Sequence, residues 1–366
     1  MSKLNDLIEE LCTDGVEFVK LGDVCDIKRG VRVIKKNLQA IGCNPVFQNS
    51  LIPLGYKDEA NYPANTTFVI SAGAAGDIGY SSIPFWAADD CLAISCPSCI
   101  INKFIYYFLK SNERSIKSKV RKASVPRLSR TVIENILFPL PPLPIQEEIV
   151  RILDSFAELE AELEAELDCR KRQYEFYRDR LLSFEDDDTE KSKVVWKKMS
   201  EVCKIMNGKD YKQLSEGAIP VYGSGGIMTY VNEYAYDKPS VLIPRKGSIG
   251  NLFYVEKPFW TVDTIYWTNI DASLIIPKFF YYFLTTKDLT KLNTAAGVPS
   301  LTQSMLYKIK IPLPPLSVQQ RIVSILDRFE ALTTDLQNGL PAEIEARRQQ
   351  YEYYRDKLLT FKEKER

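Results

Sequence analysis

The chain contains a long internal repeat, and this feature limits the possible folds more than any other. Residues 139–156 (PLPPLPIQEEIVRILDSF) and 312–329 (PLPPLSVQQRIVSILDRF) match at twelve of eighteen positions, with an offset of 173 residues. A second pair, 174–184 (YEFYRDRLLSF) and 351–361 (YEYYRDKLLTF), matches at eight of eleven positions with an offset of 177. A repeat of this length indicates two copies of one structural unit.

Each half of the chain consists of a variable region followed by a constant region. Weak matches between the variable regions keep the same order, such as the sequence PFW at 84 and 258 and YYFL at 106 and 281. We expect five segments, which are a globular domain at 1–138, a central helical region at 139–184, an acidic linker at 185–193, a second globular domain at 194–311 and a C-terminal helical region at 312–366.

The constant regions have the pattern of long helices. Both open with Pro-Leu-Pro-Pro-Leu, which favours an extended entry to a helix. Pro144 suits the first turn of the first helix, and Ser317–Gln320 fits a capping box at the start of the second. Apolar residues at steps of three and four predict a coiled-coil seam, which begins with Ile145, Ile149, Ile152 and Phe156 in one copy and Val318, Ile322, Ile325 and Phe329 in the other.

A helix of about forty residues would be about 60 Å long and needs a partner helix. We expect the two copies to pair antiparallel, and parallel pairing with another subunit is the alternative geometry. The change of offset corresponds to one inserted helical turn near Leu340 and Pro341, where we expect the proline to kink the second helix.

Residues 157–168 are three tandem tetrapeptides, AELE, AELE and AELD. A unit of four residues is close to one helical turn, so a copy can be gained or lost while the helix continues. Each copy would change the helix length by about 6 Å. The glutamates themselves are expected to form a solvated face.

The variable regions predict an α+β fold. In the first, the runs FVKLGDV (18–24), TTFVISAG (66–73) and CLAISC (91–96) have the composition of strands, and 100–112 has the apolar spacing of a helix. The complete prediction is two globular α/β domains joined by two long helices that form an antiparallel coiled coil, with a pseudo-two-fold internal repeat.

Positive charge is segregated, although Lys plus Arg and Asp plus Glu are equal at 48 each. Residues 103–130 hold nine Lys or Arg and one acid, and Lys28, Arg29, Arg32, Lys35 and Lys36 form a second cluster without acids. Such clusters indicate contacts with nucleic-acid phosphates, against the alternative of a solvated face. The second variable region has fewer cations, and Asn207, Ser248, Thr294, Ser300 and Gln303 are expected to read bases there.

The glycine turns Ser71–Gly76 and Arg245–Gly250 align with each other after predicted strands, and they lack the spacing of a phosphate loop for nucleotides. Close approach to DNA or a tight hairpin would both use them. The predicted DNA-binding residues are Lys28, Arg29, Arg32, Arg121, Lys122, Ser124, Arg127, Lys204, Asn207, Lys209, Arg245, Lys246, Ser248, Ser300 and Gln303.

The composition argues against most catalytic sites. The chain has no histidine, which removes Ser-His and Cys-His pairs and imidazole metal ligands. We find no ATP loop and no methyltransferase motif, and the carboxylates Asp89, Asp90 and Asp263 are isolated. We therefore expect no catalytic, cofactor-binding or metal-binding residues.

The eight cysteines are expected to be reduced thiols, and Cys91, Cys96 and Cys99 to be small buried residues in preference to zinc ligands. The N-terminus lacks the apolar segment of a signal peptide, and no window has the length of a membrane span. We expect a cytoplasmic protein.

These features together resemble the specificity subunit of a type I restriction-modification enzyme. The resemblance rests on two variable domains that alternate with two helical blocks entered through LPPL, on Gln146 and Gln319 with the following Ile-Val, and on the AELE repeats. The segments Ser124–Leu128 and Gly297–Leu301, shortly before each PLPPL, resemble the last loop of the recognition domains in that family.

The resemblance implies that each variable domain recognises half of a bipartite, asymmetric DNA target, while the coiled coil fixes the gap. It also implies two docked modification subunits, with adenine methylation and ATP-driven cleavage performed by modification and restriction partners. The patch Tyr174, Tyr177 and Arg178 and its copy Tyr351, Tyr354 and Arg355 would be either coil core or a docking surface for the modification subunits. A coiled-coil structural adaptor and a free-standing DNA-processing enzyme are the alternative functions.

Overall fold

The computed structural model describes residues 2–184, 194–293, 298–335 and 338–364. The chain divides into two compact units, and each contains segments from distant parts of the sequence. Unit 1 comprises Met1–Glu164 and Glu343–Arg366, and unit 2 comprises Ala165–Ala342. The predicted acidic linker, 185–193, lies outside the described residues.

Among its described residues, unit 1 contains three sheets. The four-stranded sheet has the order β2-β8-β5-β6, the three-stranded sheet has the order β4-β3-β7, and β1 pairs with β9. The strands are β1 (Phe18–Lys20), β2 (Asp26–Arg29), β3 (Asn44–Phe47), β4 (Gly55–Lys57), β5 (Thr66–Ile70), β6 (Ile78–Ser81), β7 (Trp86–Ala87), β8 (Cys91–Ser95) and β9 (Leu137–Pro139).

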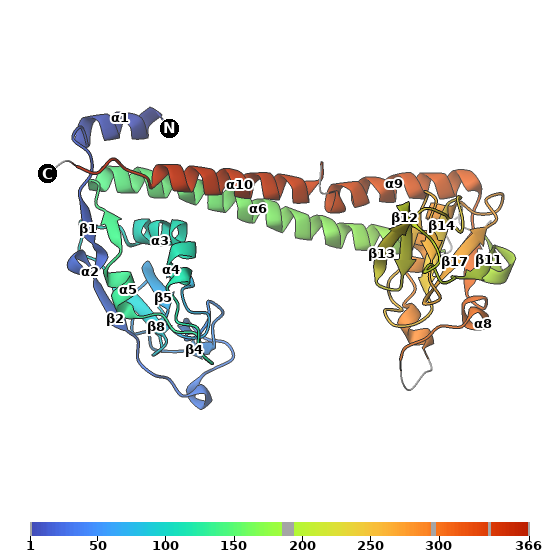
Figure 1. Ribbon diagram of the computed structural model, residues 1–366, viewed down its shortest axis with the longest axis horizontal. Coiled ribbons are helices and arrows are strands. Elements are labelled where there is room, and N and C mark those ends of the chain that lie inside the picture. The colour runs from blue at the N-terminus through green and yellow to red at the C-terminus, as the bar shows by residue number, and fades with distance from the viewer. Residues whose placement is uncertain (1, 185–193, 294–297, 336–337, 365–366) are drawn as a thin grey trace. The chain divides into compact units, whose positions relative to one another are not determined.

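The central strand β5 separates two apolar layers. Val69 faces the larger core, into which the helix α3 (Asn102–Ser111) packs against β5 and β6, and Phe68 and Ile70 face a smaller core next to the three-stranded sheet. This alternation follows from the two-residue period of a strand. Figure 1 shows α3 beside the four-stranded sheet. The other short helices of this unit are α1 (Ser2–Leu11), α2 (Leu21–Val24), η1 (Lys35–Asn37), α4 (Glu113–Ser118) and α5 (Arg130–Glu134).

One predicted strand is partly wrong. In the run FVKLGDV only Phe18–Lys20 is a strand, and Leu21–Val24 forms α2. Leu21 is fully buried, and its amide donates to the carbonyl of Ile136, so tertiary packing determined the conformation of this short apolar run. The predictions for β5, β8 and α3 are confirmed.

Unit 2 repeats the same strand order. Its four-stranded sheet is β11-β17-β14-β15, its three-stranded sheet is β13-β12-β16, and β10 pairs with β18. The strands are β10 (Val195–Lys198), β11 (Cys203–Asn207), β12 (Glu216–Gly223), β13 (Gly226–Val231), β14 (Ser240–Pro244), β15 (Phe253–Val255), β16 (Trp260–Thr261), β17 (Ile265–Ile270) and β18 (Lys310–Leu313). The short helices are η3 (Met199–Glu201), α7 (Pro277–Thr285), η4 (Leu289–Leu292) and α8 (Gln303–Leu306).

The constant regions are helical, but the two copies differ. The first forms one continuous helix of 40 residues, α6 (Leu143–Leu182). The second forms two helices of 19 residues each, α9 (Leu316–Thr334) and α10 (Leu340–Leu358), so the prediction of a single kinked helix is wrong. Pro341 occupies the first turn of α10, where its missing N–H costs nothing, and the break therefore precedes the proline.

The predicted capping box at Ser317–Gln320 is also wrong. The helix α9 begins at Leu316, one residue before Ser317, and its N-cap is Pro315 without a side-chain hydrogen bond. The fixed backbone of the preceding proline-rich segment provides the entry to the helix. Pro144 is the second residue of α6, as predicted.

Within each unit the helices pair antiparallel. In unit 1, Phe156 of α6 stacks on Tyr354 of α10, and one helical turn later on α6 Glu160 accepts a hydrogen bond from Arg348, earlier on α10. In unit 2, Tyr177 of α6 stacks on Phe329 of α9, while the end of α6 (Leu182) enters the same core as the early part of α9. Figure 1 shows α10 alongside the first part of α6.

The burial of α6 is uneven. The residues from Ile145 to Leu153 include six that are buried, and Leu182 is buried at the other end. From Asp154 to Leu181 every residue of α6 is half-buried or exposed, and this stretch includes the tandem tetrapeptides. Phe156 packs against the core of unit 1 and Tyr174 against that of unit 2, and the described residues between them, 157–173, belong to neither core.

Candidate nucleic-acid interface

In unit 1, two turns and one loop meet at one edge of the four-stranded sheet. The glycine turn Ser71–Gly76 follows β5, and the amide of Ser71 donates to the carbonyl of Asp90, just before β8, at 2.7 Å. The loop 121–128 joins them, since Leu128 donates to the carbonyl of Ser71 at 2.8 Å and Gly73 donates to Pro126 at 3.2 Å. Gly73 has a φ of +84°, and a Cβ there would lie 2.8 Å from Asn49, so this turn requires glycine.

The loop 121–127 gathers four of the predicted DNA-binding residues. Arg121 and Arg127 pair through two backbone hydrogen bonds of 2.8 and 3.1 Å, and Arg127 also forms a β-bridge with Ala72. The side chains of Arg121, Lys122, Ser124 and Arg127 are all exposed. They therefore lie together on one turn that is fixed to the sheet.

The other basic cluster of unit 1 lies at the same edge. Lys28 and Arg29 are exposed on β2, and Arg32 follows this strand. Two backbone hydrogen bonds of 2.9 Å, from Gly30 to Cys91 and from Val31 to Ala87, hold the end of β2 next to the start of β8. The fold thus brings together residues that are about a hundred positions apart in the sequence.

Unit 2 has the same junction. Arg245 donates its amide to Thr264 at 2.8 Å, Gly247 donates to Pro299 at 3.1 Å, and Leu301 donates to Arg245 at 2.9 Å. Lys246 forms a β-bridge with Ser300. The alignment of the two glycine turns is confirmed, and Gly247 has a φ of +82°, close to that of Gly73.

Most of the other predicted residues of unit 2 lie at this edge. Asn207 ends β11 and accepts a 3.3 Å hydrogen bond from Gln303, the first residue of α8. The Lys209 amide donates to Thr261 at 2.8 Å, and Ser248 is exposed in the glycine turn. Lys204 is nearer the other end of β11, where it pairs with Asn269, so it is not brought to the edge. Thr294 and Gly297 lie outside the described residues.

Fewer cations are available for phosphates than the sequence count suggests, because several have carboxylate partners. Within the basic stretch of unit 1, four cations have carboxylate partners, and these pairs are Lys103 with Asp154, Lys110 with Glu113, Lys117 with Asp77 and Arg130 with Glu134. Lys28 pairs with Asp26. In the described ranges no ion pair includes the other five cations of this stretch, and three of these five lie on the loop 121–127, which are Arg121, Lys122 and Arg127.

In each unit a buried glutamine joins the globular part to a helix of the constant region. Gln146 of α6 accepts a hydrogen bond from the Ile101 amide at 2.9 Å and donates to the carbonyls of Cys99 and Pro141. Gln319 of α9 does the same with Ile276, Leu274 and Pro314. Ile101 and Ile276 are the N-caps of α3 and α7, so each amide side chain satisfies a helix end that has no cap of its own.

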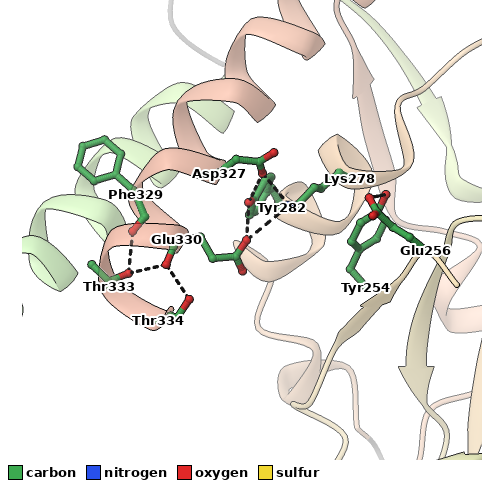
Figure 2. Close-up of polar contacts among 9 residues, drawn as sticks. All are labelled: Tyr254, Glu256, Lys278, Tyr282, Asp327, Phe329, Glu330, Thr333 and Thr334. Atoms are coloured by element: carbon green, nitrogen blue, oxygen red, sulfur yellow. Dashed lines mark hydrogen bonds and ion pairs between the residues drawn. The ribbon is translucent and has the colours of Figure 1, made fainter. Parts of the chain in front are cut away.

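A second contact of the same helices is a tyrosine–carboxylate pair. Tyr107 of α3 donates to Asp154 of α6, which also binds Lys103 at 2.7 Å. In unit 2, Tyr282 of α7 donates to Asp327 at 2.6 Å and to Glu330 at 2.8 Å, and Lys278 lies 2.9 Å from Asp327; Figure 2 shows this cluster between α7 and α9. Burial and the neighbouring carboxylates raise the pKa of both tyrosines, so both hydroxyls are protonated donors.

The Tyr/Arg patches lie along the helix pairs. Tyr174 and Tyr351 are half-buried, and burial raises the pKa of each to about 12. The guanidinium of Arg178 lies over the Tyr174 ring, and that of Arg355 over the Tyr351 ring. Tyr177 and Tyr354 stack on the facing helix. The neighbouring aromatic residues, Phe176 and Tyr353, are 59% and 61% exposed.

The described residues contain no cluster of three or more acidic, cysteine or histidine side chains arranged to hold a metal ion. All eight cysteines are free thiols. The prediction that Cys91, Cys96 and Cys99 are buried is right for Cys91 alone, because Cys96 is half-buried and Cys99, which lies after the end of β8, is exposed. Within the same ranges no helix is both long and apolar enough to cross a membrane.

Sequence reasoning missed several of the contacts that position the site. The tyrosine and lysine partners of Asp154 and Asp327 were not identified, although YYFL occurs in both copies and its second residue is the tyrosine in each case. Asn102, which accepts from Thr67 and donates to Ile94, also gave no signal, because a single asparagine at a helix start is common.

Comparison with known proteins agrees with this architecture. Residues 13–168 and 191–346 match a family model described as the type I restriction modification DNA specificity domain. The chain is 33% identical to the specificity subunit of the type I restriction enzyme EcoR124I/EcoR124II of Escherichia coli over 99% of this chain and 98% of that protein. It is 29% identical to the specificity subunit of the E. coli type I enzyme EcoprrI over 87% and 83% of the two chains.

The fold resembles a solved structure over most of its length. The type I restriction-modification system S subunit from M. genitalium superposes with a TM-score of 0.67 at 20% identity, and the match covers 94% of this chain and 96% of that chain.

Proposed function

Since this chain belongs to the specificity subunits of type I restriction-modification systems, we propose that each of its units reads one half of a bipartite DNA target. One observation carries the proposal. The two units have the same strand order, and in the part of each that the structure describes a loop with cations outside any ion pair covers the same edge of the four-stranded sheet. The sequences at the two edges differ. A shared frame with different edge residues is what two dissimilar half-sites require.

The chemistry of the edge suits duplex DNA. Arg121, Lys122 and Arg127 in unit 1 and Lys246 in unit 2 offer long, exposed cations to phosphates. The adjacent pair Asn207 and Gln303 supplies amide groups, which suit the donor and acceptor pattern of adenine in the major groove. We assign the remaining predicted residues at the two edges to the same interface.

The helix α6 is the element that would set the gap between half-sites. It runs for 40 residues without interruption, or about 60 Å. A change of length in its middle would not disrupt a globular core, because the residues there do not pack into one. One tetrapeptide of the 157–168 repeat changes its length by about 6 Å. Along B-DNA this corresponds to one or two base pairs, since the rise per base pair is about 3.4 Å.

We assign the chemistry to other subunits. In this proposal two modification subunits methylate adenine and restriction subunits perform ATP-driven cleavage, whereas this chain is non-catalytic and takes no cofactor. The cytoplasm, where chromosomal DNA lies, is the expected location. The Tyr/Arg patches contribute to the helix pairing in each unit, and docking of the modification subunits near them is part of the proposal.

The test is to footprint the chain, assembled with a methyltransferase partner, on random duplexes. We expect two conserved half-sites at a constant gap. A chain that binds all duplexes equally would be a structural adaptor, and a purified chain that turns over DNA alone would be an enzyme. Either result contradicts the proposal.

Deleting residues 161–164 (AELE) tests the role of α6. We expect both half-sites to be kept and the preferred gap to shorten by one or two base pairs, because the helix loses about one turn. The control Glu162→Gln with Glu164→Gln keeps the length and should keep the gap. An altered half-site with an unchanged gap would refute this part of the proposal.

A further inference from the structure

One β-bridge occurs at the same place in both units but carries its cation on opposite sides. In unit 1 the bridge joins Ala72 to Arg127, and in unit 2 it joins Lys246 to Ser300. Backbone hydrogen bonds establish the equivalence. Leu128 donates to Ser71 as Leu301 donates to Arg245, and Gly73 donates to Pro126 as Gly247 donates to Pro299. Ala72 therefore corresponds to Lys246, and Arg127 corresponds to Ser300.

Each bridge thus has one cation and one uncharged residue. The side chains of Arg127 and Lys246 are exposed, and among the described residues neither belongs to an ion pair. Ala72 is buried, with 4% of its surface exposed, and Ser300 is half-buried. Backbone hydrogen bonds hold the bridge in both units. The cation of each unit therefore extends from one of the two paired residues of equivalent bridges.

The surroundings of this bridge are not shared. Unit 1 adds Arg121 and Lys122 from the loop, whereas unit 2 adds Arg245 from the glycine turn. The neighbouring hairpins differ as well, because β3 and β4 are separated by residues 48–54 and β12 and β13 only by residues 224–225. Both edges have one positive charge at the bridge. The loop residue supplies it in unit 1, and the glycine-turn residue supplies it in unit 2.

A contact that two dissimilar half-sites share is with the phosphate backbone, because phosphates are the same at every sequence and base edges are not. We propose that the bridge cation, Arg127 in unit 1 and Lys246 in unit 2, holds a DNA phosphate at the equivalent position of each unit. It sets how tightly the unit binds and does not select bases. This inference rests on the proposed DNA-binding function.

The arrangement allows the charge to be moved across the bridge. The Lys246 amide donates to Thr264 at 3.3 Å, so the ammonium is the group that is free to reach a phosphate. The amide of Ser300 donates to the side-chain Oδ1 of Asn293 at 3.1 Å, and the Ser300 side chain is not needed for that contact. An arginine at 300 would begin where Arg127 begins in unit 1.

The experiment uses the full chain with its methyltransferase partner and measures binding to a target duplex and to an unrelated duplex across a KCl series. Lys246→Ala should weaken binding to both duplexes by a similar factor, about 3- to 10-fold at low salt, and reduce the salt slope by about one. Adding Ser300→Arg to Lys246→Ala should restore affinity and slope. Lys257→Ala is the matched control. It removes an exposed lysine that follows β15 at the end of the sheet away from the glycine turn.

Sequence selection on a random library completes the test. The half-sites should be the same for wild type, Lys246→Ala and the double variant. A changed half-site in Lys246→Ala, or an intact Ser300→Arg variant that restores nothing, would overturn the inference. If Ser300→Arg does not fold, Arg127→Lys and Arg127→Ser in unit 1 replace it, and only the second should lose affinity and salt slope.

The outcomes also separate this inference from the proposed function. If wild type shows no sequence preference, the proposed function fails, and the bridge cation is still judged by its salt slope on the unrelated duplex. If wild type selects a bipartite target and Lys246→Ala binds both duplexes like wild type, only the bridge inference fails.

Discussion

Units 1 and 2 share a framework of sheets and helix contacts, but the side chains at their sheet edges differ. The strand order, the glutamine at the start of the long helix and the tyrosine–carboxylate pair occur in both, whereas the cations at the sheet edge come from different loops. The shared core contacts and the proposed DNA-binding surface are therefore encoded at separate positions. Either edge can therefore change its side chains without loss of the core that holds it.

The two frames are not identical in detail. The hydroxyl of Tyr282 lies within hydrogen-bond distance of two carboxylates, which share its single proton, whereas that of Tyr107 donates to one. Glu148 of α6 is buried and binds Arg151 and Lys3, whereas the corresponding position of α9 is Arg321, which is exposed. These differences allow the shared and the unit-specific contacts to be measured separately.

The largest effect should come from the glutamines. Gln146→Leu leaves one buried N–H and two carbonyls without their partner, and Gln319→Leu does the same in unit 2, so each should cost about 3–5 kcal/mol of unfolding free energy. Hydrogen exchange at Ile101 or Ile276 assigns the loss to its unit. Gln349→Leu, at an exposed position of α10, is the control. A cost below 1 kcal/mol for one variant would mean that the two anchors are not equivalent.

A smaller effect should distinguish the tyrosines. Tyr282→Phe removes an O–H whose single proton is shared between two partly exposed carboxylates and should cost about 2–3 kcal/mol, and Tyr107→Phe removes a donor to one carboxylate and should cost about 1–2 kcal/mol. Urea unfolding followed by unit-resolved hydrogen exchange measures both. The exposed Tyr353→Phe should leave stability unchanged. Equal costs would show that Glu330 adds nothing to the contact.

The smallest effect is a dependence on pH confined to unit 1. The hydrogen bonds from Arg151 hold the pKa of Glu148 at about 2, below its ordinary value near 4.5. Because the folded pKa is the lower one, this contact stabilises unit 1 fully above about pH 5, and the stabilisation is lost as the pH falls from there towards 2. The urea concentration at the unfolding midpoint of unit 1 should therefore decrease as the pH is lowered from 5 to 3. The decrease should be smaller in Glu148→Gln.

The neighbouring Glu147→Gln, at an exposed position, is the control and should behave like wild type. Unit 2 has no carboxylate at the corresponding position, so its midpoint should not respond to Glu148→Gln at any pH. An identical pH response in wild type and Glu148→Gln would show that the ion pair with Arg151 adds no stability.

Much of the frame was predictable because it depends on local periodicity. The apolar steps from Ile145 to Phe156 predicted α6, and the matched PLPPL segments predicted two equivalent units. The break between α9 and α10 was not predictable from the same pattern, since the seam continues through Leu332 and Leu336 while the helix ends at Thr334. The DNA contacts themselves stay a prediction, although the fold places most of the proposed residues together.

The duplication, the order of variable and constant regions and the apolar faces of the helices follow directly from the amino-acid sequence, because repeats and periodicity can be read along the chain. Which cations lack an ion-pair partner and which segments form the edge depends on how the chain folds. Those outcomes depend on hydrogen bonds and ion pairs between residues far apart in the chain, such as Leu128 with Ser71 and Lys103 with Asp154. No local pattern records them.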